Sequence, residues 1–394
     1  MEIKFPNKGL HSWVIKSRTR ALVTEVESWR LDDSLGALHC KPHPISEYMW
    51  KKLLRLNPNN LGNWSTRELK VYGTQRIERD LIFSLVDLLG GKSDWEGYVT
   101  SGATESNIYS VWVGRNFLRR KIPNKRICII VNDLSHYSLL KAADICGIDP
   151  IKASLNRERW VFDIKAVLST IKNAKKKYEG FLIPLTLGYT QTGTNDDYEE
   201  IVRELENLEN EIGIKTFAFI DAALNGLVLP FTRKDFRPLK NERIQSFCLD
   251  FHKAGMTPLP CGVILYRRRL RPFIEKTNSY LKENDSTLLG SRSGIPAVAA
   301  WSVIMQLGRS GFKEVINHSI DRKLSFIFEL RKNFPKVEIA DDGDGLSLGL
   351  VNEQPLSKSF IDKYGLYAKE ASFTFTSGKE NLYIYKVAFL PLNW

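Results

Sequence analysis

A lysine follows one of the short apolar runs of the chain, where a free ammonium group is costly to bury. The run Ser246–Leu249 leads into Asp250, Phe251, His252 and Lys253. Burial lowers the pKa of an unpaired lysine and so favours a neutral, nucleophilic amine. Such an amine is suited to hold a carbonyl compound as a Schiff base. A lysine turned out to solvent is nevertheless the more common outcome for a segment of this kind.

An aspartate ends another apolar run. Phe217–Ile220 is followed by Asp221, Ala222 and Ala223. A carboxylate at the end of a buried strand would lie at the ligand-binding edge of a parallel sheet, where it can pair with a cationic atom of a ligand. It can equally begin a loop or cap a helix. This segment alone leaves both interpretations open.

Small residues and hydroxyl groups precede a stretch with helical spacing. Ser101, Gly102, Ala103 and Thr104 lead into the amphipathic stretch Glu105–Arg119. Free N–H groups at a helix start, together with serine and threonine hydroxyls, indicate an anion site such as a phosphate cradle. The alternative is simple N-capping by Ser101 or Thr104.

A histidine lies just beyond a further apolar run. Ser135, His136, Tyr137 and Ser138 follow Ile127–Val131. An imidazole at a strand end can stack on a flat ligand or transfer protons. A single histidine in such a place is more often structural. A functional role for His136 is therefore indicated only in combination with the other three segments.

The elements that must position these residues are strands alternating with helices. This order predicts a mostly parallel α/β sheet covered on both faces. Ligands of such sheets bind beyond the carboxyl ends of the strands, which is where the four segments lie. The predicted strands are Ile127–Val131, Phe181–Leu187, Thr216–Ile220, Ser246–Leu249 and Val263–Tyr266, and the predicted helices are Glu105–Arg119, Asp163–Tyr178 and Asp197–Ile212.

The two ends of the chain have other patterns. Residues 1–65 contain short helical pieces and a polar, turn-rich stretch, which indicates an arm lying across the molecule or across a partner subunit. Residues 66–295 would form the large ligand-binding domain. Residues 296–394 are expected to form a small α+β domain, with helical patterns in Ala297–Leu307 and Phe312–Asn333 and strand-like pieces at Val337–Ala340, Leu346–Val351 and Tyr383–Phe389.

Composition restricts the class of protein. The 394 residues are 43% hydrophobic and 26% charged, which is typical of a globular chain with more than one domain. Neither a membrane span nor a secretory signal is expected, because no apolar run reaches 18 residues and the N-terminus lacks an apolar stretch. The five cysteines are odd in number and indicate reduced thiols in a cytoplasmic protein.

The net charge of +12 is spread along the chain. Its clusters are Arg119–Lys121, Lys175–Lys177 and Arg267–Arg269, and no aromatic residues interleave with them as in a base-stacking surface. The first two clusters end helical stretches, where cations suit the helix dipole. We therefore expect a solvated basic surface that favours anionic ligands, with neither nucleic acid nor membrane as a partner.

The four segments together resemble one family. Ser-Gly-Ala-Thr-Glu-Ser-Asn at 101–107, Ser-His-Tyr-Ser at 135–138, Asp-Ala-Ala at 221–223 and His-Lys at 252–253 look like the pyridoxal-phosphate-dependent group II amino acid decarboxylases. Residues 258–263 and 290–294 are similar to the histidine and serine decarboxylase branch. The similarity runs from about Asn57 to Leu330. It implies the fold type I, aspartate aminotransferase-like arrangement, with a small C-terminal α+β domain, in a homodimer with shared active sites.

The resemblance also implies a role for each residue. Lys253 would hold pyridoxal 5'-phosphate as a Schiff base, and Asp221 would pair with its pyridinium nitrogen. Ala223 and His136 would pack on opposite faces of the ring, with His136 near the substrate carboxylate. The remaining implied contacts are Ser101, Gly102, Ala103 and Thr104 on the phosphate with help from His252, Thr192 and Thr194 in a threonine-rich loop beside the cofactor, and Ser291 in the substrate pocket, contributed by the partner subunit. No metal site is implied.

The expected reaction is the decarboxylation of an L-amino acid to an amine and carbon dioxide. The electrons left on the α-carbon need an acceptor, which a protonated cofactor ring provides. A carboxylate close to the ring nitrogen favours the protonated form. Histidine, serine, an aromatic amino acid, an acidic amino acid and a carrier-bound amino acid all remain possible substrates.

Two departures from the branch leave an alternative open. Asp250 and Phe251 stand where the histidine decarboxylase branch has a Ser-Gly pair, and resemble archaeal tyrosine/aspartate decarboxylases. The stretch from Ser291 to Trp301 resembles sphingosine phosphate lyases. The alternative function is therefore a carbon–carbon lyase or aldehyde-forming relative that uses the same cofactor. A cofactor-binding protein without catalysis is disfavoured, because Lys253 and Asp221 are both present.

Overall fold

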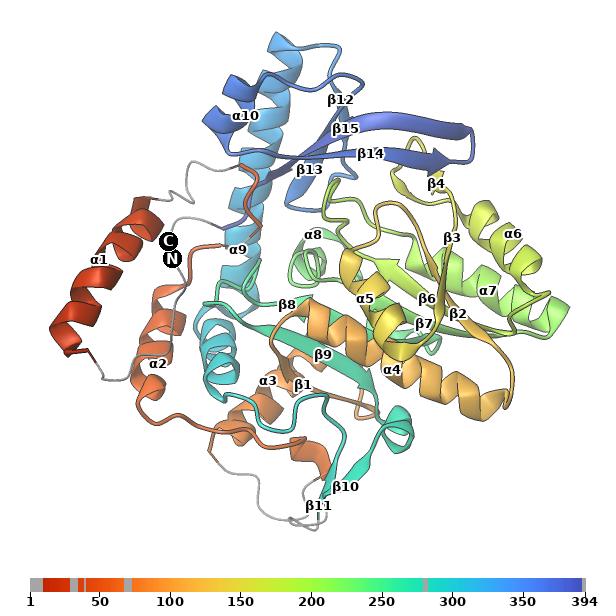
Figure 1. Ribbon diagram of the computed structural model, residues 1–394, viewed down its shortest axis with the longest axis horizontal. Helices are drawn as coiled ribbons and strands as arrows, with labels where there is room; N and C mark the ends of the chain where they lie inside the picture. Colours follow the sequence, from red (N-terminus) through yellow and green to blue (C-terminus); the bar gives the residue numbers. More distant parts are fainter. Residues whose placement is uncertain (1–9, 29–34, 39, 67–72, 279–282, 392–394) are drawn as a thin grey trace.

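A seven-stranded sheet forms the centre of the computed structural model, which describes residues 10–28, 35–38, 40–66, 73–278 and 283–391 (Figure 1). The strand order is β1-β9-β8-β7-β6-β2-β3. β9 runs antiparallel to both of its neighbours, whereas the pairs from β8 to β3 are parallel. The bounds are β1 Trp95–Thr100, β2 Ile127–Val131, β3 Asp149–Lys152, β6 Gly180–Thr186, β7 Lys215–Asp221, β8 Ile244–Asp250 and β9 Gly262–Arg267. The mostly parallel sheet is confirmed, and β1 and β3 are strands that the apolar runs did not reveal.

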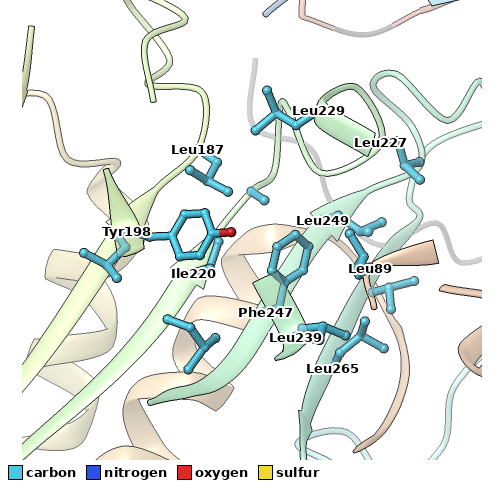
Figure 2. Close-up of a cluster of buried hydrophobic side chains, with 14 of the residues drawn as sticks. Leu89, Leu187, Tyr198, Ile220, Leu227, Leu229, Leu239, Phe247, Leu249 and Leu265 are labelled. Atoms are coloured by element: carbon cyan, nitrogen blue, oxygen red, sulfur yellow. The ribbon is translucent and has the colours of Figure 1, made fainter. Parts of the chain in front are cut away.

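The alternation of side chains along the strands divides the core into two layers. Ile220, Phe247 and Leu249 belong to the layer shown in Figure 2, which packs against α3 (Thr74–Leu88), α6 (Ile164–Ala174) and α7 (Tyr198–Ile212). Phe219 and Cys248 point to the opposite layer, under α4 (Ala103–Lys121) and α5 (Tyr137–Cys146). Because both faces are covered, the strands are continuous apolar runs and lack polar alternation.

Helices begin and end at local signals in the sequence. Asp197 caps α7 by accepting a hydrogen bond from the Glu200 N–H at 3.1 Å, and Gly213 ends the helix in the left-handed conformation. The helix predicted from Asp163 to Tyr178 is shorter in the structure. It ends at Ala174, whose carbonyl accepts the N–H of Tyr178 at 2.9 Å, so the last residues form a turn.

The N-terminal segment contributes α1 (Ser12–Ser28) and α2 (Pro44–Leu54). α2 packs on α9, whereas α1 lies to one side of the body in Figure 1. Among the α1 side chains that the structure describes, the exposed large apolar ones are Trp13, Ile15, Leu22 and Val23. Residues 1–9, 29–34 and 39 of the predicted arm lie outside the described residues, and its contact with a partner stays a prediction.

The C-terminal part is built on a long helix and a second sheet. α9 (Ile295–Asn333) is kinked at Gly308, and its two halves are the two helices that the sequence predicts. The six-stranded sheet has the order β12-β13-β15-β14-β4-β5, so it includes two short strands from before residue 296. Its bounds, with the remaining short elements, are β4 Leu155–Asn156, β5 Val161–Phe162, α8 Leu229–Thr232, β10 Lys276–Asn278, β11 Glu283–Asp285, β12 Glu338–Ala340, β13 Ser347–Asn352, α10 Lys358–Tyr364, β14 Tyr367–Phe375 and β15 Gly378–Ala388.

The basic clusters differ from one another in burial. Arg119–Lys121 occupy the last turn of α4, as the helix dipole favours. Arg267 is not part of the solvated surface that was expected, because its side chain is 2% exposed. It donates hydrogen bonds to the carbonyls of Leu239 and Asn241 at 3.2 and 2.8 Å.

Among the helices of the described ranges, none has the length and the apolar character needed to cross a membrane.

Candidate active site

A cavity of about 270 Å³ opens where the carboxyl ends of the parallel strands meet. The parallel register pairs Thr186 of β6 with Asp221 of β7, and Asp221 with Cys248 of β8. Residues that follow these strand ends therefore converge on one place. The lining residues are Ser101, Gly102, Ala103, Thr104, Leu134, His136, Tyr137, Thr186, Gly188, Thr190, Asp221, Ala223, Leu224, Asp250, His252, Lys253 and Leu259.

The loop before α4 forms one wall of the cavity. Gly102 has φ +147° and ψ 174°, a conformation that only glycine adopts readily. The N–H and hydroxyl of Ser101 donate to Glu105 Oε2 at 2.7 and 2.8 Å, and the Ala103 N–H donates to Asp250 Oδ1 at 2.7 Å. Thr104 lies in the first helical turn, where an N–H group has no acceptor within the helix. The predicted cradle thus lies at the cavity, with two of its amides already bonded to carboxylates.

Lys253 faces this cavity and is largely withdrawn from solvent. Its Nζ lies 3.0 Å from Asp250 Oδ2, and its side chain is 18% exposed. His252 Nε2 lies 3.5 Å from the same carboxylate oxygen, and His252 Nδ1 lies 2.9 Å from the Cys261 carbonyl oxygen. Asp250 therefore joins the α4 loop to the lysine through its two oxygens. The ion pair removes much of the cost of burying the ammonium group.

Asp221 is held by contacts from three sides. Its Oδ2 accepts a hydrogen bond from Asn107 Nδ2 at 2.7 Å, and its Oδ1 accepts one from the Ala223 N–H at 3.2 Å. The Cys248 thiol lies 3.6 Å from Oδ1. Burial, and then the Asp221 charge, raise the pKa of Cys248, so the thiol stays protonated. The carboxylate is 4% exposed and can pair with a cationic ring atom in the cavity.

His136 lines the cavity at the start of α5. Its Nδ1 lies 2.8 Å from the Ser138 hydroxyl and accepts the Ser138 N–H at 3.3 Å. Burial lowers the pKa of His136, and the nearby Asp221 charge opposes that shift. The ring is therefore available in its neutral form for contact with a flat ligand.

Three residues singled out from the sequence do not line the cavity of this chain. Thr192 and Thr194 bond to each other at 2.7 Å, and Thr194 donates to the Trp160 carbonyl at 2.7 Å. Thr190 of the same loop lines the cavity in their place. Ser291 is exposed and accepts a hydrogen bond from Asn59 Nδ2 at 3.3 Å, so any role in the pocket would be in a partner subunit.

Sequence reasoning missed four polar residues of the site. Asp250 ends β8 as Asp221 ends β7, and the same strand-end rule would have found it. Thr190 follows β6 by the same rule. Asn107 and Ser138 are the last residues of the motifs at 101–107 and 135–138 but received no role, because only the packing of α4 against α5 brings them together.

The donor set of the cavity fits a flat aldehyde cofactor with an anionic arm. Lys253 offers a primary amine, Asp221 offers a carboxylate, and the start of α4 offers amides and hydroxyls. The backbones are close-packed here, because a Cβ at Gly262 would lie 2.6 Å from Gly102 Cα. Pyridoxal phosphate, with its aldehyde, ring nitrogen and phosphate, matches these three groups.

Comparison with known proteins agrees with this donor set. Residues 82–348 match the family model described as the pyridoxal-dependent decarboxylase conserved domain. A tryptophan decarboxylase of Clostridium sporogenes is 32% identical over 79% of this chain and 75% of its own length, and a probable L-tyrosine/L-aspartate decarboxylase of Methanothrix thermoacetophila is 32% identical over 83% and 79%. The crystal structure of L-methionine decarboxylase from Streptomyces sp. 590 superposes with a TM-score of 0.82 at 16% identity, over 98% of this chain and 93% of that one. The structural match concerns the fold.

Proposed function

The chain belongs to the pyridoxal-dependent decarboxylase family, and on that premise we propose that Lys253 holds the cofactor while Asp221 and His136 direct the loss of the carboxyl group. The protein is a pyridoxal-phosphate-dependent amino acid decarboxylase with the fold type I architecture. The observation that carries the residue assignment is the presence of Lys253, Asp221 and the α4 loop in one cavity.

Pyridoxal phosphate, when bound, supplies a conjugated ring that accepts the electron pair left behind by carbon dioxide. Asp221 favours a proton on the nitrogen beside it through opposite charge. Asn107 and Ala223 hold that carboxylate in place, so it need not reorganise when charge changes in the cavity. Lys253 is the residue whose amine would hold the cofactor, and it can return a proton to the α-carbon.

The start of α4 would hold the anionic arm of the cofactor. Gly102 and Thr104 contribute backbone N–H groups, and Thr104 a hydroxyl, at the positive end of the helix dipole. The Ala103 N–H and the Ser101 hydroxyl, which bond to Asp250 and Glu105 in the structure, would exchange these partners for the phosphate. His252 lies close to this loop, because a Cβ at Gly102 would be 3.3 Å from His252 Cε1. This supports the role of His252 beside the phosphate.

His136 and Ala223 are proposed to face opposite sides of the flat ring. Both line the cavity, and Ala223 follows Asp221 directly along the chain. A bond perpendicular to the ring is the one that its π system weakens. A substrate carboxylate held in that direction by His136 would therefore be lost in preference to the α-proton.

The lysine assignment is tested by covalent trapping. We expect the purified protein to be yellow and to keep its cofactor after borohydride reduction, whereas Lys253→Ala would lose the reducible covalent bond. Lys165→Ala, at an exposed position on α6, is the matched control and should behave as wild type. A Lys253→Ala protein that still holds cofactor covalently contradicts the assignment.

The substrate is identified by a screen of amino acids for release of carbon dioxide, with the amine product measured by mass. Relatives named for tryptophan, tyrosine and aspartate decarboxylation make these three the first candidates. An amine together with carbon dioxide supports the proposal. An aldehyde product without carbon dioxide would instead identify a carbon–carbon lyase, the alternative that the stretch after Ser291 suggested.

We further propose that the protein is a homodimer in which the partner subunit completes each active site, and that it is located in the cytoplasm. Tyr137 and Leu259 line the cavity, yet they are 57% and 56% exposed in a single chain. A partner subunit that supplies Ser291 would cover such a surface. All five cysteines are free and buried, which supports a reducing compartment.

A further inference from the structure

A line of hydrogen-bonded side chains joins Asp221 to His136. Asn107 Nδ2 donates to Asp221 Oδ2 at 2.7 Å and to Ser138 Oγ at 2.9 Å. Ser138 Oγ lies 2.8 Å from His136 Nδ1. Asn107 lies on α4, Asp221 ends β7, and Ser138 lies on α5, which His136 caps. Asn107 and Ser138 are completely buried. The middle of the line is thus shielded from bulk solvent.

The orientation of the Asn107 amide follows from its neighbours. A carboxylate accepts hydrogen bonds and donates none, so the amide nitrogen must face Asp221. The Cys248 thiol lies 3.6 Å from Asn107 Oδ1 and 3.6 Å from Asp221 Oδ1. Because burial raises the pKa of the thiol it remains protonated, and its one hydrogen can be donated to either of these two oxygens. Each polar atom of Asn107 thus has a partner of the right kind.

The direction of the remaining bonds is then fixed. Ser138 Oγ accepts from Asn107, so its one hydrogen is free to donate to His136 Nδ1. The backbone N–H of Ser138 donates to the same nitrogen at 3.3 Å. A nitrogen that accepts two hydrogen bonds carries no hydrogen, and the imidazole hydrogen must lie on Nε2.

We propose that Asn107 is a positioning residue that holds Asp221 in place and, through Ser138, fixes His136 as the neutral tautomer with its hydrogen on Nε2. The proposal rests on the proposed function, in which Asp221 and His136 flank the cofactor. It deepens that function, because the Nε2–H is the donor that His136 can offer to an anionic ligand group such as the substrate carboxylate. One buried amide thereby orients both groups that direct the reaction.

The charges around His136 agree with a neutral ring. Burial is the largest influence and lowers the pKa of His136; the Asp221 and Asp250 charges raise it, and the Lys253 and Lys141 charges lower it. The two acidic and the two basic side chains thus act on the pKa of His136 in opposite directions. The hydrogen bonds to Nδ1 add to the effect of burial, because they stabilise the unprotonated nitrogen.

The tautomer can be measured directly in protein without cofactor. Histidine labelled with ¹⁵N gives separate NMR signals for protonated and unprotonated ring nitrogens, and a His136→Gln variant identifies which of the six histidines is observed. We expect unprotonated Nδ1 and protonated Nε2 in the wild-type protein. A hydrogen on Nδ1 overturns the proposal, whether or not the cofactor binds.

Variants of Ser138 test the route of the effect. Ser138→Ala should move the Nδ1 signal toward the average of exchanging tautomers, and Ser138→Thr, which keeps the hydroxyl, should restore it. Ser110→Ala is the matched control, because Ser110 is equally buried but accepts its hydrogen bond from Ser246, away from the site. An unchanged His136 signal in Ser138→Ala contradicts the proposed role of Ser138.

Asn107→Asp tests the link to Asp221. It keeps the shape of the side chain but turns an acceptor toward the Asp221 carboxylate, so we expect at least a tenfold weaker cofactor affinity and an altered pH dependence of the cofactor absorption spectrum. Asn116→Asp on the same helix is the control, because the Asn116 amide donates to the Phe273 carbonyl. Wild-type affinity and spectrum in Asn107→Asp would overturn the positioning role. A Lys253→Ala protein that still holds cofactor covalently would contradict the proposed function and leave the tautomer result standing, so the two failures are distinguishable.

Discussion

Asp250 connects the loop before α4 to Lys253, two parts of the site that lie far apart in the sequence. Its Oδ1 accepts the Ala103 N–H, and its Oδ2 lies 3.0 Å from Lys253 Nζ. The contact gives Lys253, which follows a buried strand, an acidic partner inside the protein. Asp250 is also the residue that differs from the serine of the histidine decarboxylase branch, so the departure lies inside the active site.

Substitution of Asp221 should separate catalysis from stability. In Asp221→Ala the Asn107 amide and the Ala223 N–H lose their acceptor, which costs about 1–3 kcal/mol of folding free energy. Turnover should fall by about 100-fold or more, because a fixed charge beside the reacting system is lost. Steady-state kinetics and urea unfolding of the same preparation measure both. Full activity would remove Asp221 from its proposed role.

Gly102→Ala should weaken cofactor binding. The backbone conformation at this position costs about 1–3 kcal/mol for any residue with a Cβ. The new methyl group would also lie 3.3 Å from His252 Cε1. We expect an approximately tenfold or greater rise in the cofactor dissociation constant, measured by absorbance titration. Gly213→Ala at the end of α7 is the control: it should lower stability and leave that constant unchanged.

At the scale of elements, α3 fixes the position of the C-terminal end of β1. Glu78 Oε1 accepts the Val99 N–H at 2.8 Å and bonds to Arg292 Nη1 at 2.6 Å. The same arginine donates to the Val99 carbonyl and to the Gly62 carbonyl. One buried ion pair thus ties the strand that leads into the cofactor loop to the segment that carries Ser291.

Glu78→Gln should therefore be strongly destabilising. It leaves the buried Arg292 without a counter-charge, which costs about 3–5 kcal/mol. Asp87→Asn on the same helix breaks the Asp87–Arg309 pair, whose side chains are mostly exposed, and should cost less than about 1 kcal/mol. Urea unfolding of both variants gives the comparison. Equal losses would show that burial does not set the strength of the Glu78 pair.

The elements themselves were predictable to different degrees. β2 has the predicted bounds, and the other predicted strands of the central sheet are found within one or two residues, because buried parallel strands are continuous apolar runs. In the second sheet β12 and β13 lie within one residue of their predicted bounds, whereas β15 begins at Gly378, five residues before the predicted start at Tyr383. α10 and β14 were not predicted. The division of the chain at residue 295 stays a prediction, since α9 begins there but packs against α2 and α3 as well as leading into the second sheet.

At the scale of the whole molecule, the second sheet and the active site interact through charge: Lys386 of β15 lies close enough to Lys253 for the two side chains to repel each other. Burial and the Lys253 charge lower the pKa of Lys386 from 10.5 to about 8. The unfolded chain binds more protons than the folded chain between these values, so stability rises with pH through that window. Below pH 8 Lys386 is charged in the folded chain as well, and the loss of stability caused by burying that charge is fully present.

Lys386→Met should consequently stabilise the protein without cofactor at pH 7, by on the order of 1–2 kcal/mol after allowance for partial exposure. The gain should disappear as the pH approaches 10.5. Lys379→Met, at an exposed position on the same strand, is the control. Urea unfolding at pH 7 and pH 10 measures the difference. A gain that does not depend on pH would indicate improved packing without a charge effect.

Shared active sites can be tested by mixing two inactive subunits. If Ser291 acts in the partner's cavity, Ser291→Trp and Lys253→Ala each inactivate a homodimer, but a heterodimer of the two has one intact site. Random mixing should then restore about a quarter of wild-type activity. Analytical ultracentrifugation tests whether the chain forms a dimer. Full activity of Ser291→Trp alone, or no recovery on mixing, contradicts the shared site.

The sequence by itself determined the chemistry that this protein can carry out. Strand-end residues such as Lys253, Asp221 and His136 are recognisable because a parallel sheet gathers the ends of its strands at one edge, so order along the chain predicts proximity. Only the tertiary structure decided which neighbours orient them. The contacts of Asn107, Ser138 and Asp250 depend on how α4 packs over the sheet and against α5. Thr190 lines the cavity, whereas Thr192 and Thr194 bond to each other, because long-range packing sets the direction of a loop side chain.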